Sequence, residues 1–186
     1  MHINPDTGLL DQTLFLASPN CDERPCDAAP ELIVVHNISL PPGQFGGPYI
    51  EQLFTNCLNP DEHPYFAEIS HLRVSAHALI RRDGRVIQFV PFHQRAWHAG
   101  KSNWCSRERC NDFSIGIELE GNDDCPFEAV QYEQLADMIR ALQVCYPAIT
   151  GQAITGHSDI APDRKTDPGP YFSWATLHQL LSNKTG

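Results

Sequence analysis

The sequence predicts a single α/β domain in which a central mixed β-sheet is flanked by helices. Segments 31–38 and 113–120 are rich in apolar and β-branched residues, which is typical of buried strands. Segment 128–145 instead repeats apolar residues at the spacing of a helix. The chain has 186 residues, of which 41% are hydrophobic, and this suits one sizeable core. Together these features favour a layered domain of sheet and helices.

The first 30 residues differ in composition from the rest. They are polar and interrupted by proline, aspartate and cysteine, around one short apolar stretch at 14–16. We expect residues 1–30 to form an N-terminal arm on the surface, ahead of a main domain over residues 31–186.

A long excursion, residues 39–72, follows the first strand. Prolines and glycines at 41–48 predict a loop, a short helix is expected around 49–57, and another loop over 59–65. Long excursions in compact domains are often lids over functional sites. We therefore expect residues 39–66 to move when a ligand enters.

Two strand signals follow the excursion. Asp83 and Gly84 lie between apolar runs at 75–81 and 86–89, which predicts a β-hairpin because glycine accepts positive φ. The strand 113–120 alternates strictly. It places Phe113, Ile115, Ile117 and Leu119 on one face, and Ser114, Gly116, Glu118 and Glu120 on the other.

Two helices complete the domain. The helix over 128–145 should end before Pro147, and the last helix should begin near Ser173, a suitable N-cap. The residues expected to face the core are Leu135, Met138, Ile139 and Leu142 in the first, and Trp174, Leu177 and Leu181 in the second.

The charge balance restricts the possible partners. A formal net charge of −10 disfavours nucleic acid and anionic membranes, since both require clustered positive charge. No apolar run approaches the roughly 20 residues that cross a bilayer. The first residues also lack a basic region followed by an apolar one, as a secretion signal has. We expect a cytoplasmic protein. We also expect a monomer, because no feature of the sequence calls for a larger assembly.

The chain contains 7 cysteines at irregular spacing. Cys21 and Cys26 share a spacing with Cys105 and Cys110, which leaves a four-thiolate zinc site open as a hypothesis. Reduced thiols are the favoured interpretation for a cytosolic protein.

Three residues suggest a catalytic metal centre. His36 ends an apolar run, and His157 and Asp167 lie in a segment whose glycines and prolines prevent regular structure. Two imidazoles and a carboxylate are a normal ligand set for catalytic zinc, with one position left open for water. Taken singly, each residue would more often be structural. Asp159 is a rival third ligand, and spacing alone separates it only weakly from Asp167.

Two further residues could carry chemistry beside a metal. Glu118 lies on the polar face of its strand beside Gly116, which leaves room for a neighbour, and could transfer a proton. Glu120 competes for that role. Lys165 could stabilise a developing oxyanion. The chain has no H-E-x-x-H, no G-x-S-x-G and no P-loop, so metalloprotease, serine-hydrolase and nucleotide chemistry are disfavoured.

Five segments resemble one known family, in order and with family-like spacing. They are 34–43, 74–77, 96–100, 111–121 and 155–169. The family is that of the zinc amidases that share a fold with peptidoglycan-recognition proteins, in particular the cytosolic amidases of anhydro-muropeptides. The resemblance runs from about Leu32 to the last helix, so the zinc amidase domain would span residues 31–186.

The resemblance implies a fold, a site and a reaction. His36, His157 and Asp167 would hold one zinc ion, Glu118 would be the general base and acid, and Lys165 would stabilise the tetrahedral intermediate. The reaction would be hydrolysis of the amide between the lactyl group of anhydro-N-acetylmuramic acid and L-Ala of the stem peptide. This would recycle cell-wall fragments and lower the muropeptide signal that induces β-lactamase.

The implied substrate suggests binding residues. Stem peptides carry carboxylates, so arginines should line the cleft, and a guanidinium can bind a carboxylate through two hydrogen bonds. The cationic candidates are Arg73, Arg107 and Arg109. The candidates for contact with sugar or peptide are Asn37, Tyr65 and Trp97, although Trp97 could equally pack in the core.

Two alternatives to this amidase remain open at this point. Some proteins of the same fold bind muropeptides without cutting them, although these usually lack a metal ligand. A zinc peptidase that cuts within the stem peptide is the other alternative.

Overall fold

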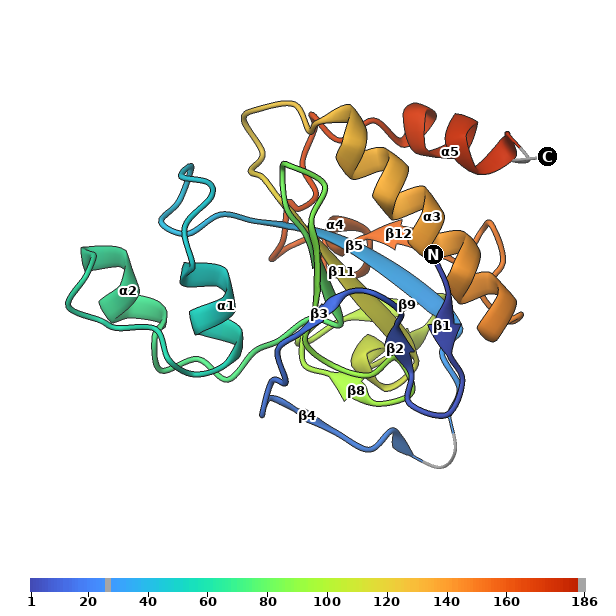
Figure 1. Cartoon of the computed structure of the whole chain (residues 1–186), viewed down its shortest axis with the longest axis horizontal. Helices are drawn as coiled ribbons and strands as arrows, with labels where there is room; N and C mark the ends of the chain where they lie inside the picture. The colour runs from blue at the N-terminus through green and yellow to red at the C-terminus, as the bar shows by residue number, and fades with distance from the viewer. Residues whose placement is uncertain (26–27, 184–186) are drawn as a thin grey trace.

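The computed structural model describes residues 1–25 and 28–183 and is built around a six-stranded sheet (Figure 1). Its strands in spatial order are β12 (Ile154–Gly156), β5 (Leu32–Ile38), β11 (Ser114–Glu120), β6 (Ala78–Ile80), β7 (Val86–Gln88) and β3 (Leu14–Phe15). The first four run parallel, β7 is antiparallel to β6, and β3 is parallel to β7. The predicted mixed sheet is confirmed.

One face of the sheet packs on two helices, α3 (Ala129–Cys145) and α5 (Trp174–Ser182) (Figure 1). Both begin where the sequence predicts: Glu128 forms a capping box with Gln131, and the Ser173 hydroxyl accepts a hydrogen bond from the Thr176 backbone N–H. Their shared core consists of Ile33, Val35, Ile115, Ile117, Leu119, Leu135, Met138, Ile139, Leu142 and Leu177. Trp174 and Leu181 are partly buried at its edge.

The opposite face of β5 and β11 is also buried, although β11 presents polar residues there. A loop region covers it, with β8 (Arg95–Ala96), β9 (Asn103–Trp104), β10 (Arg107–Glu108) and the 3₁₀-helix η2 (Cys110–Asp112). Buried polar residues require partners, so this face can build a site while the helical face supplies stability.

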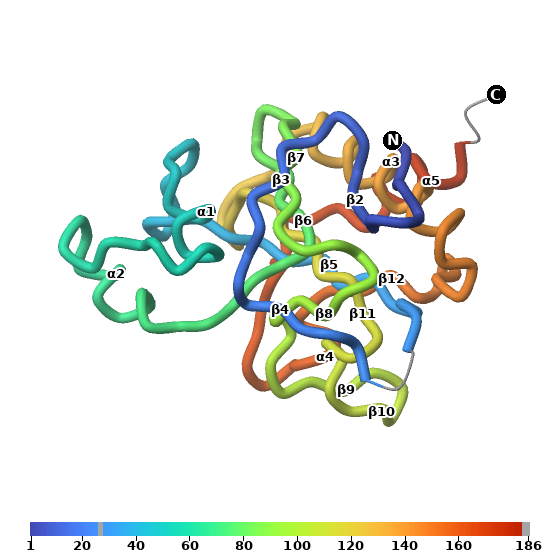
Figure 2. Tube along the Cα trace, turned by 60° about the horizontal axis from the view of Figure 1, so that its bottom comes forward, coloured from blue at the N-terminus to red at the C-terminus, as the bar shows by residue number. Residues whose placement is uncertain are grey.

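The N-terminal arm takes part in the domain. It contains β1 (Ile3–Asn4), β2 (Leu9–Leu10) and β4 (Cys21–Asp22), besides β3 at the sheet edge. Figure 2 shows the arm passing from β3 to β4, which pairs with β8. Ile3 and Leu10 are buried in the main core. The expectation of an arm on the surface is therefore corrected in part, because Ile3 and Leu10 are buried in the main core while Leu14 and Phe15, at the sheet edge, stay exposed.

The excursion 39–72 stands to one side of the sheet (Figures 1 and 2). It contains the expected helix α1 (Tyr49–Phe54) and a second helix, α2 (Pro64–Ile69), that falls partly on a predicted loop. Proline at the first turn and an N-cap at His63 are local signals that could have revealed α2. Movement of residues 39–66 stays a prediction.

Two further sequence predictions concern a hairpin and membrane-spanning helices. The hairpin between β6 and β7 is confirmed, with Gly84 at φ +83°. Within the described residues, no helix combines the length and apolar character needed to span a bilayer.

Candidate active site

Parallel strands bring the predicted metal ligands to one edge of the sheet. His36 lies near the end of β5, and His157 is the first residue of α4 (His157–Ile160), directly after β12. Because Gly156 is aligned with Val35 in the β12–β5 pair, the two histidines emerge side by side. Asp167 joins them from the following loop, whose backbone carbonyl at 167 accepts a hydrogen bond from Ser158 N–H.

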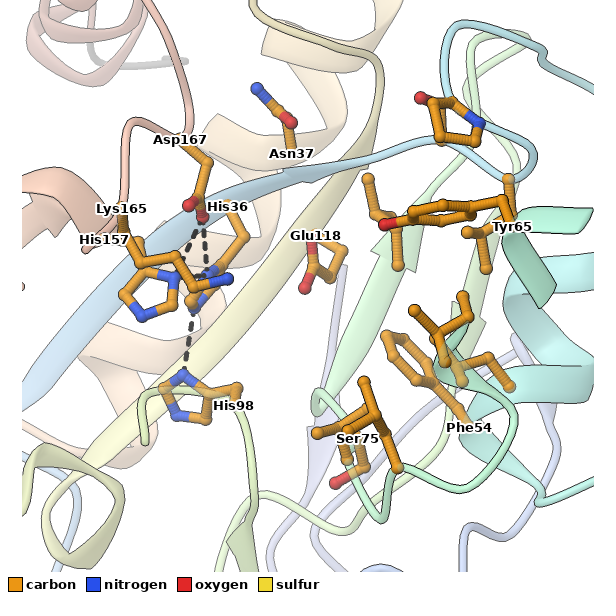
Figure 3. Close-up of a pocket in the computed structure, with 18 residues that line it drawn as sticks. His36, Asn37, Phe54, Tyr65, Ser75, His98, Glu118, His157, Lys165 and Asp167 are labelled. Atoms are coloured by element: carbon orange, nitrogen blue, oxygen red, sulfur yellow. Dashed lines mark hydrogen bonds and ion pairs between the residues drawn. The ribbon is translucent and has the colours of Figure 1, made fainter. Parts of the chain in front are cut away.

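The three side chains meet at a single point (Figure 3). His36 Nδ1, His157 Nδ1 and Asp167 Oδ2 lie 3.0 Å from one another in all three pairs. Zinc bonds of about 2.0–2.2 Å in a tetrahedral site imply ligand separations of roughly 3.3–3.5 Å, close to those here. They form the one group of metal-ligating side chains found in residues 1–25 and 28–183.

The hydrogen-bonding chemistry of this cluster calls for a cation. His157 Nε2 lies 3.1 Å from the Ala99 carbonyl oxygen, which only accepts, so the His157 proton is on Nε2 and the Nδ1 lone pair is free. Burial lowers the pKa of His36 to about 4, although Asp167 opposes this shift. Burial raises the pKa of Asp167, but the two imidazoles outweigh it and hold the pKa well below its usual range. Lone pairs therefore converge, and these residues fit a divalent metal.

Asp159, the rival ligand, faces away from this point. Its Oδ2 accepts hydrogen bonds from Thr155 Oγ1 at 2.8 Å and from Gly156 N–H at 2.9 Å. The carboxylate is thus used within the turn that begins α4, and the geometry favours Asp167.

Glu118 lies beside the cluster, on the strand next to that of His36, and Figure 3 shows it between the cluster and Tyr65. It is 8% exposed, and its Oε2 has no hydrogen-bond partner among the described residues. Burial, reinforced by the Asp167 charge, raises its pKa well above the usual value, against the opposing charge of Lys165. A carboxyl group with a raised pKa that faces a cavity is suited to accept and return a proton.

Glu120 is held elsewhere, although it lies on the same strand face as Glu118. Its Oε1 accepts from Arg81 Nη1 at 2.6 Å and from Gly46 N–H at 2.7 Å. Its Oε2 accepts from the Arg82 backbone N–H at 3.1 Å, so neither carboxylate oxygen is left free for the metal cluster.

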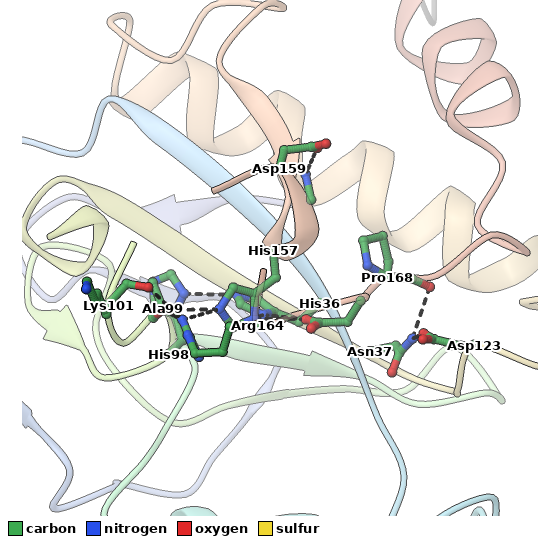
Figure 4. Close-up of polar contacts among 12 residues, drawn as sticks. His36, Asn37, His98, Ala99, Lys101, Asp123, His157, Asp159, Arg164 and Pro168 are labelled. Atoms are coloured by element: carbon green, nitrogen blue, oxygen red, sulfur yellow. Dashed lines mark hydrogen bonds and ion pairs between the residues drawn. The ribbon is translucent and has the colours of Figure 1, made fainter. Parts of the chain in front are cut away.

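A cavity of about 360 Å³ opens beside the cluster and includes Glu118 and the half-buried Lys165. Tyr65 and Asn37 also line it, and their contact with substrate stays a prediction. The Asn37 amide donates to Asp123 Oδ1 at 2.7 Å and to the Pro168 carbonyl at 3.0 Å (Figure 4). Asn37 thus also tethers the loop that carries Asp167.

The other substrate candidates do not line this cavity. Arg73 is exposed and donates to backbone carbonyls of residues 70–72. Trp97 donates from Nε1 to Asp22. Arg109 is exposed beside Asp112 and lines a separate depression of about 410 Å³. Arg107 lies over the Phe113 ring and pairs with Glu31.

Sequence reasoning missed two groups of cavity residues. One is His98, which belongs to a segment of the family resemblance but was given no role. The other is an apolar wall, mostly supplied by the excursion: Leu40, Leu53, Phe54, Ile69, Leu72 and Val74. Only the folding of the excursion reveals that these side chains share a surface with the cluster.

The described cysteines, Cys21, Cys57, Cys105, Cys110, Cys125 and Cys145, are free thiols. Cys26 lies outside the described residues, and the metal-ligating group found in the described part of the chain contains no cysteine. The four-thiolate hypothesis therefore gains no support.

Comparison with known proteins agrees with this geometry. The family profile of N-acetylmuramoyl-L-alanine amidases matches residues 27–170, which includes all three metal-ligand candidates. The chain belongs to this amidase family. The resemblance seen in the sequence is thereby confirmed.

Individual relatives of the amidase are close in sequence and fold. It is 63% identical over 168 residues to the 1,6-anhydro-N-acetylmuramyl-L-alanine amidase AmpD of Escherichia coli K12, covering 90% of this chain and 91% of AmpD. A crystal structure of a selenomethionine AmpD derivative has a TM-score of 0.94 at 57% identity, covering 98% of this chain and 100% of that one. The fold prediction is confirmed by this agreement.

A more distant relative has been solved with a ligand. The amidase AmiD of E. coli, in complex with its substrate anhydro-N-acetylmuramic acid-L-Ala-D-γ-Glu-L-Lys, has a TM-score of 0.59 at 29% identity. The match covers 92% of this chain and 60% of AmiD.

Proposed function

We propose that this amidase uses zinc to hydrolyse the amide bond between the lactyl group of anhydro-N-acetylmuramic acid and L-Ala of the stem peptide. The observation that carries the proposal is the convergence of His36, His157 and Asp167 beside Glu118, whose Oε2 has no hydrogen-bond partner in the described part of the chain. The similarity to AmpD and the substrate bound to AmiD support this choice of substrate.

Zinc fits the donor set. Two neutral imidazoles and one carboxylate would hold a divalent ion with net positive charge and would leave one ligand position for water. A zinc ion held there supplies a Lewis acid that polarises the scissile carbonyl and lowers the pKa of water to about 7.

Residues of the chain itself carry out proton transfer, charge stabilisation and substrate binding. Glu118, held at a raised pKa, accepts the proton of the attacking water and returns it to the leaving amine. Lys165, at the cavity wall, stabilises negative charge on the former carbonyl oxygen. Asn37 and Tyr65 contact sugar or peptide, and the apolar wall of the excursion shields the bond from bulk water.

The proposed reaction belongs to the recycling of the cell wall. Removing the stem peptide from anhydro-muropeptides recycles cell-wall fragments in the cytoplasm. It also lowers the muropeptide signal for β-lactamase in cells that have that circuit.

Metal analysis combined with product identification tests the proposal. Purified protein is depleted with a chelator, reloaded with zinc and incubated with anhydro-N-acetylmuramyl tripeptide, and products are identified by mass spectrometry. We expect one zinc per chain and release of the intact peptide with L-Ala at its N-terminus. Cleavage within the peptide would show a peptidase, and binding without cleavage by the zinc-loaded protein would show a recognition protein.

A further inference from the structure

One short segment contacts the Nε2 atoms of both candidate zinc histidines, on the opposite side of each ring from the Nδ1 atom that faces the proposed metal. The segment is the dipeptide His98–Ala99, which lies between β8 and β9. His36 Nε2 lies 2.9 Å from His98 Nδ1, and His157 Nε2 lies 3.1 Å from the Ala99 carbonyl oxygen (Figure 4). Both Nδ1 atoms, on the other side of each ring, are the ones that converge.

These contacts determine which ring nitrogen of each histidine carries the proton. The Ala99 carbonyl only accepts, so it fixes the His157 proton on Nε2. A free lone pair on His36 Nδ1 likewise places its proton on Nε2, and His98 Nδ1 must then accept it. The His98 proton is left on Nε2, where the Ser114 hydroxyl oxygen at 3.1 Å accepts it.

We propose that the dipeptide His98–Ala99 positions the metal centre, by accepting the Nε2 protons of both His36 and His157 so that both Nδ1 lone pairs face one cation. His98 is a positioning residue in this assignment, because it acts through His36. The inference rests on the proposed zinc site.

The fold holds this dipeptide firmly. Asn111 Oδ1 accepts from both of its backbone N–H groups, at 3.1 and 2.8 Å. Arg164 donates to the Ala99 carbonyl at 2.6 Å and to the Lys101 carbonyl at 2.8 Å. A backbone segment bonded at both ends cannot easily follow a reoriented imidazole, so it imposes one orientation on the ligands.

The strand β11 is shaped to receive the His98 ring. A Cβ atom on Gly116 would lie 2.4 Å from His98 Cγ, so only glycine leaves room for the imidazole at this point of the strand. Ser114, two residues earlier on the same face, supplies the acceptor that ends the chain of hydrogen bonds. Such outer partners are typically worth about 10- to 100-fold in metal affinity.

Two substitutions at His98 separate positioning from packing. His98→Leu removes the acceptor and keeps much of the volume, whereas His98→Asn keeps an oxygen near the position of Nδ1. Zinc dissociation constants are measured by competition with a chromophoric chelator, on protein shown to be folded by circular dichroism. We expect His98→Leu to weaken zinc binding about 10- to 100-fold and His98→Asn to restore most of the loss.

Nitrogen NMR of the zinc-loaded, histidine-labelled protein gives a readout that requires no variant. We expect protons on Nε2 of His36, His157 and His98, with metal at Nδ1 of the first two. Coordination of His36 through Nε2, or a proton on His98 Nδ1, would overturn the inference even if His98→Leu does not fold.

The outcomes distinguish this inference from the proposed function. If the unaltered protein binds no zinc, the proposed function fails and the inference fails with it. If it binds zinc tightly and His98→Leu binds equally tightly, only the positioning role is overturned.

Discussion

Glu118 and His36 are register partners on neighbouring parallel strands, so their side chains leave the same face of the sheet side by side. His36 belongs to the candidate metal cluster, and Glu118 carries a carboxyl oxygen that has no hydrogen-bond partner among residues 1–25 and 28–183. A rigid β-ladder therefore sets the spacing between the proposed metal and the proposed proton carrier, and positioned acid–base catalysis requires such precision.

Glu118→Gln should leave zinc content unchanged and lower kcat by about 10²-fold or more, because the amide cannot accept a proton. Metal analysis and steady-state kinetics measure the two effects. Glu120→Gln is the matched control: it breaks the buried pair with Arg81, so it should lower thermal stability while the folded enzyme stays active. Full activity of Glu118→Gln would assign the proton to another group.

Asp167→Ala should lose zinc and activity together, since it removes one of three ligands. The matched control is Asp159→Asn, which keeps an oxygen that can accept from Thr155 Oγ1 and Gly156 N–H. Residue 159 faces away from the place where the three candidate ligands converge. Zinc content of both variants after dialysis checks this assignment. If Asp159→Asn loses zinc and Asp167→Ala retains it, then Asp159 and not Asp167 is the third ligand.

Lys165→Met should retain zinc and lower kcat by roughly 10²–10³-fold, the usual effect of removing one donor to a developing oxyanion. Because the ammonium acts on the transition state, KM should change little. Lys101→Met, on the separate depression, is the control and should have kinetics close to the unaltered enzyme. A large rise in KM with an unchanged kcat would indicate ground-state binding instead.

Gly116→Ala should destabilise the protein by about 1–3 kcal/mol, because the added methyl overlaps the His98 ring and forces it to shift. Zinc binding should weaken in parallel. Gly151→Ala is a suitable control, since a Cβ there meets nothing within 4 Å. Urea unfolding of both variants measures the difference, and equal stabilities would contradict the packing argument.

Acid should destabilise the zinc-free protein partly through His77, which the metal cluster does not include. His77 Nδ1 accepts from Gly116 N–H at 3.0 Å, and Nε2 faces the Gln94 carbonyl at 3.1 Å, so the ring is held neutral. Burial, together with the nearby Arg24 charge, lowers the pKa of His77 to about 3 from its ordinary value of 6.5.

The sign of this effect follows from proton uptake. Between pH 6.5 and about 3 the unfolded chain binds a proton at His77 that the folded chain does not, so stability falls as pH falls. The slope from this one group is at most about 1.4 kcal/mol per pH unit. Urea unfolding from pH 7 to 4 should show a shallower slope for His77→Gln than for the unaltered protein, and equal slopes would contradict the assignment.

Local patterns in the chain were sufficient to predict most elements. The alternation in β11, the apolar period of α3 and the cap at Ser173 each depend on neighbours within a few residues. Such signals act through backbone geometry and local burial, and the structure confirms them. The predicted loop over 59–65 is wrong at its end, because Pro64 is the first residue of a helix that His63 caps.

The sequence by itself determined which strands and helices form, and it supplied the histidines and carboxylates that a metal needs. Only the tertiary structure decided between carboxylates that are alike locally. Glu120 is neutralised by Arg81, 39 residues away, and Asp159 is used by its own turn, which leaves Glu118 and Asp167 for the site. The reason is physical: a carboxylate's role depends on the charges and donors that surround it in space, and distant segments bring most of these.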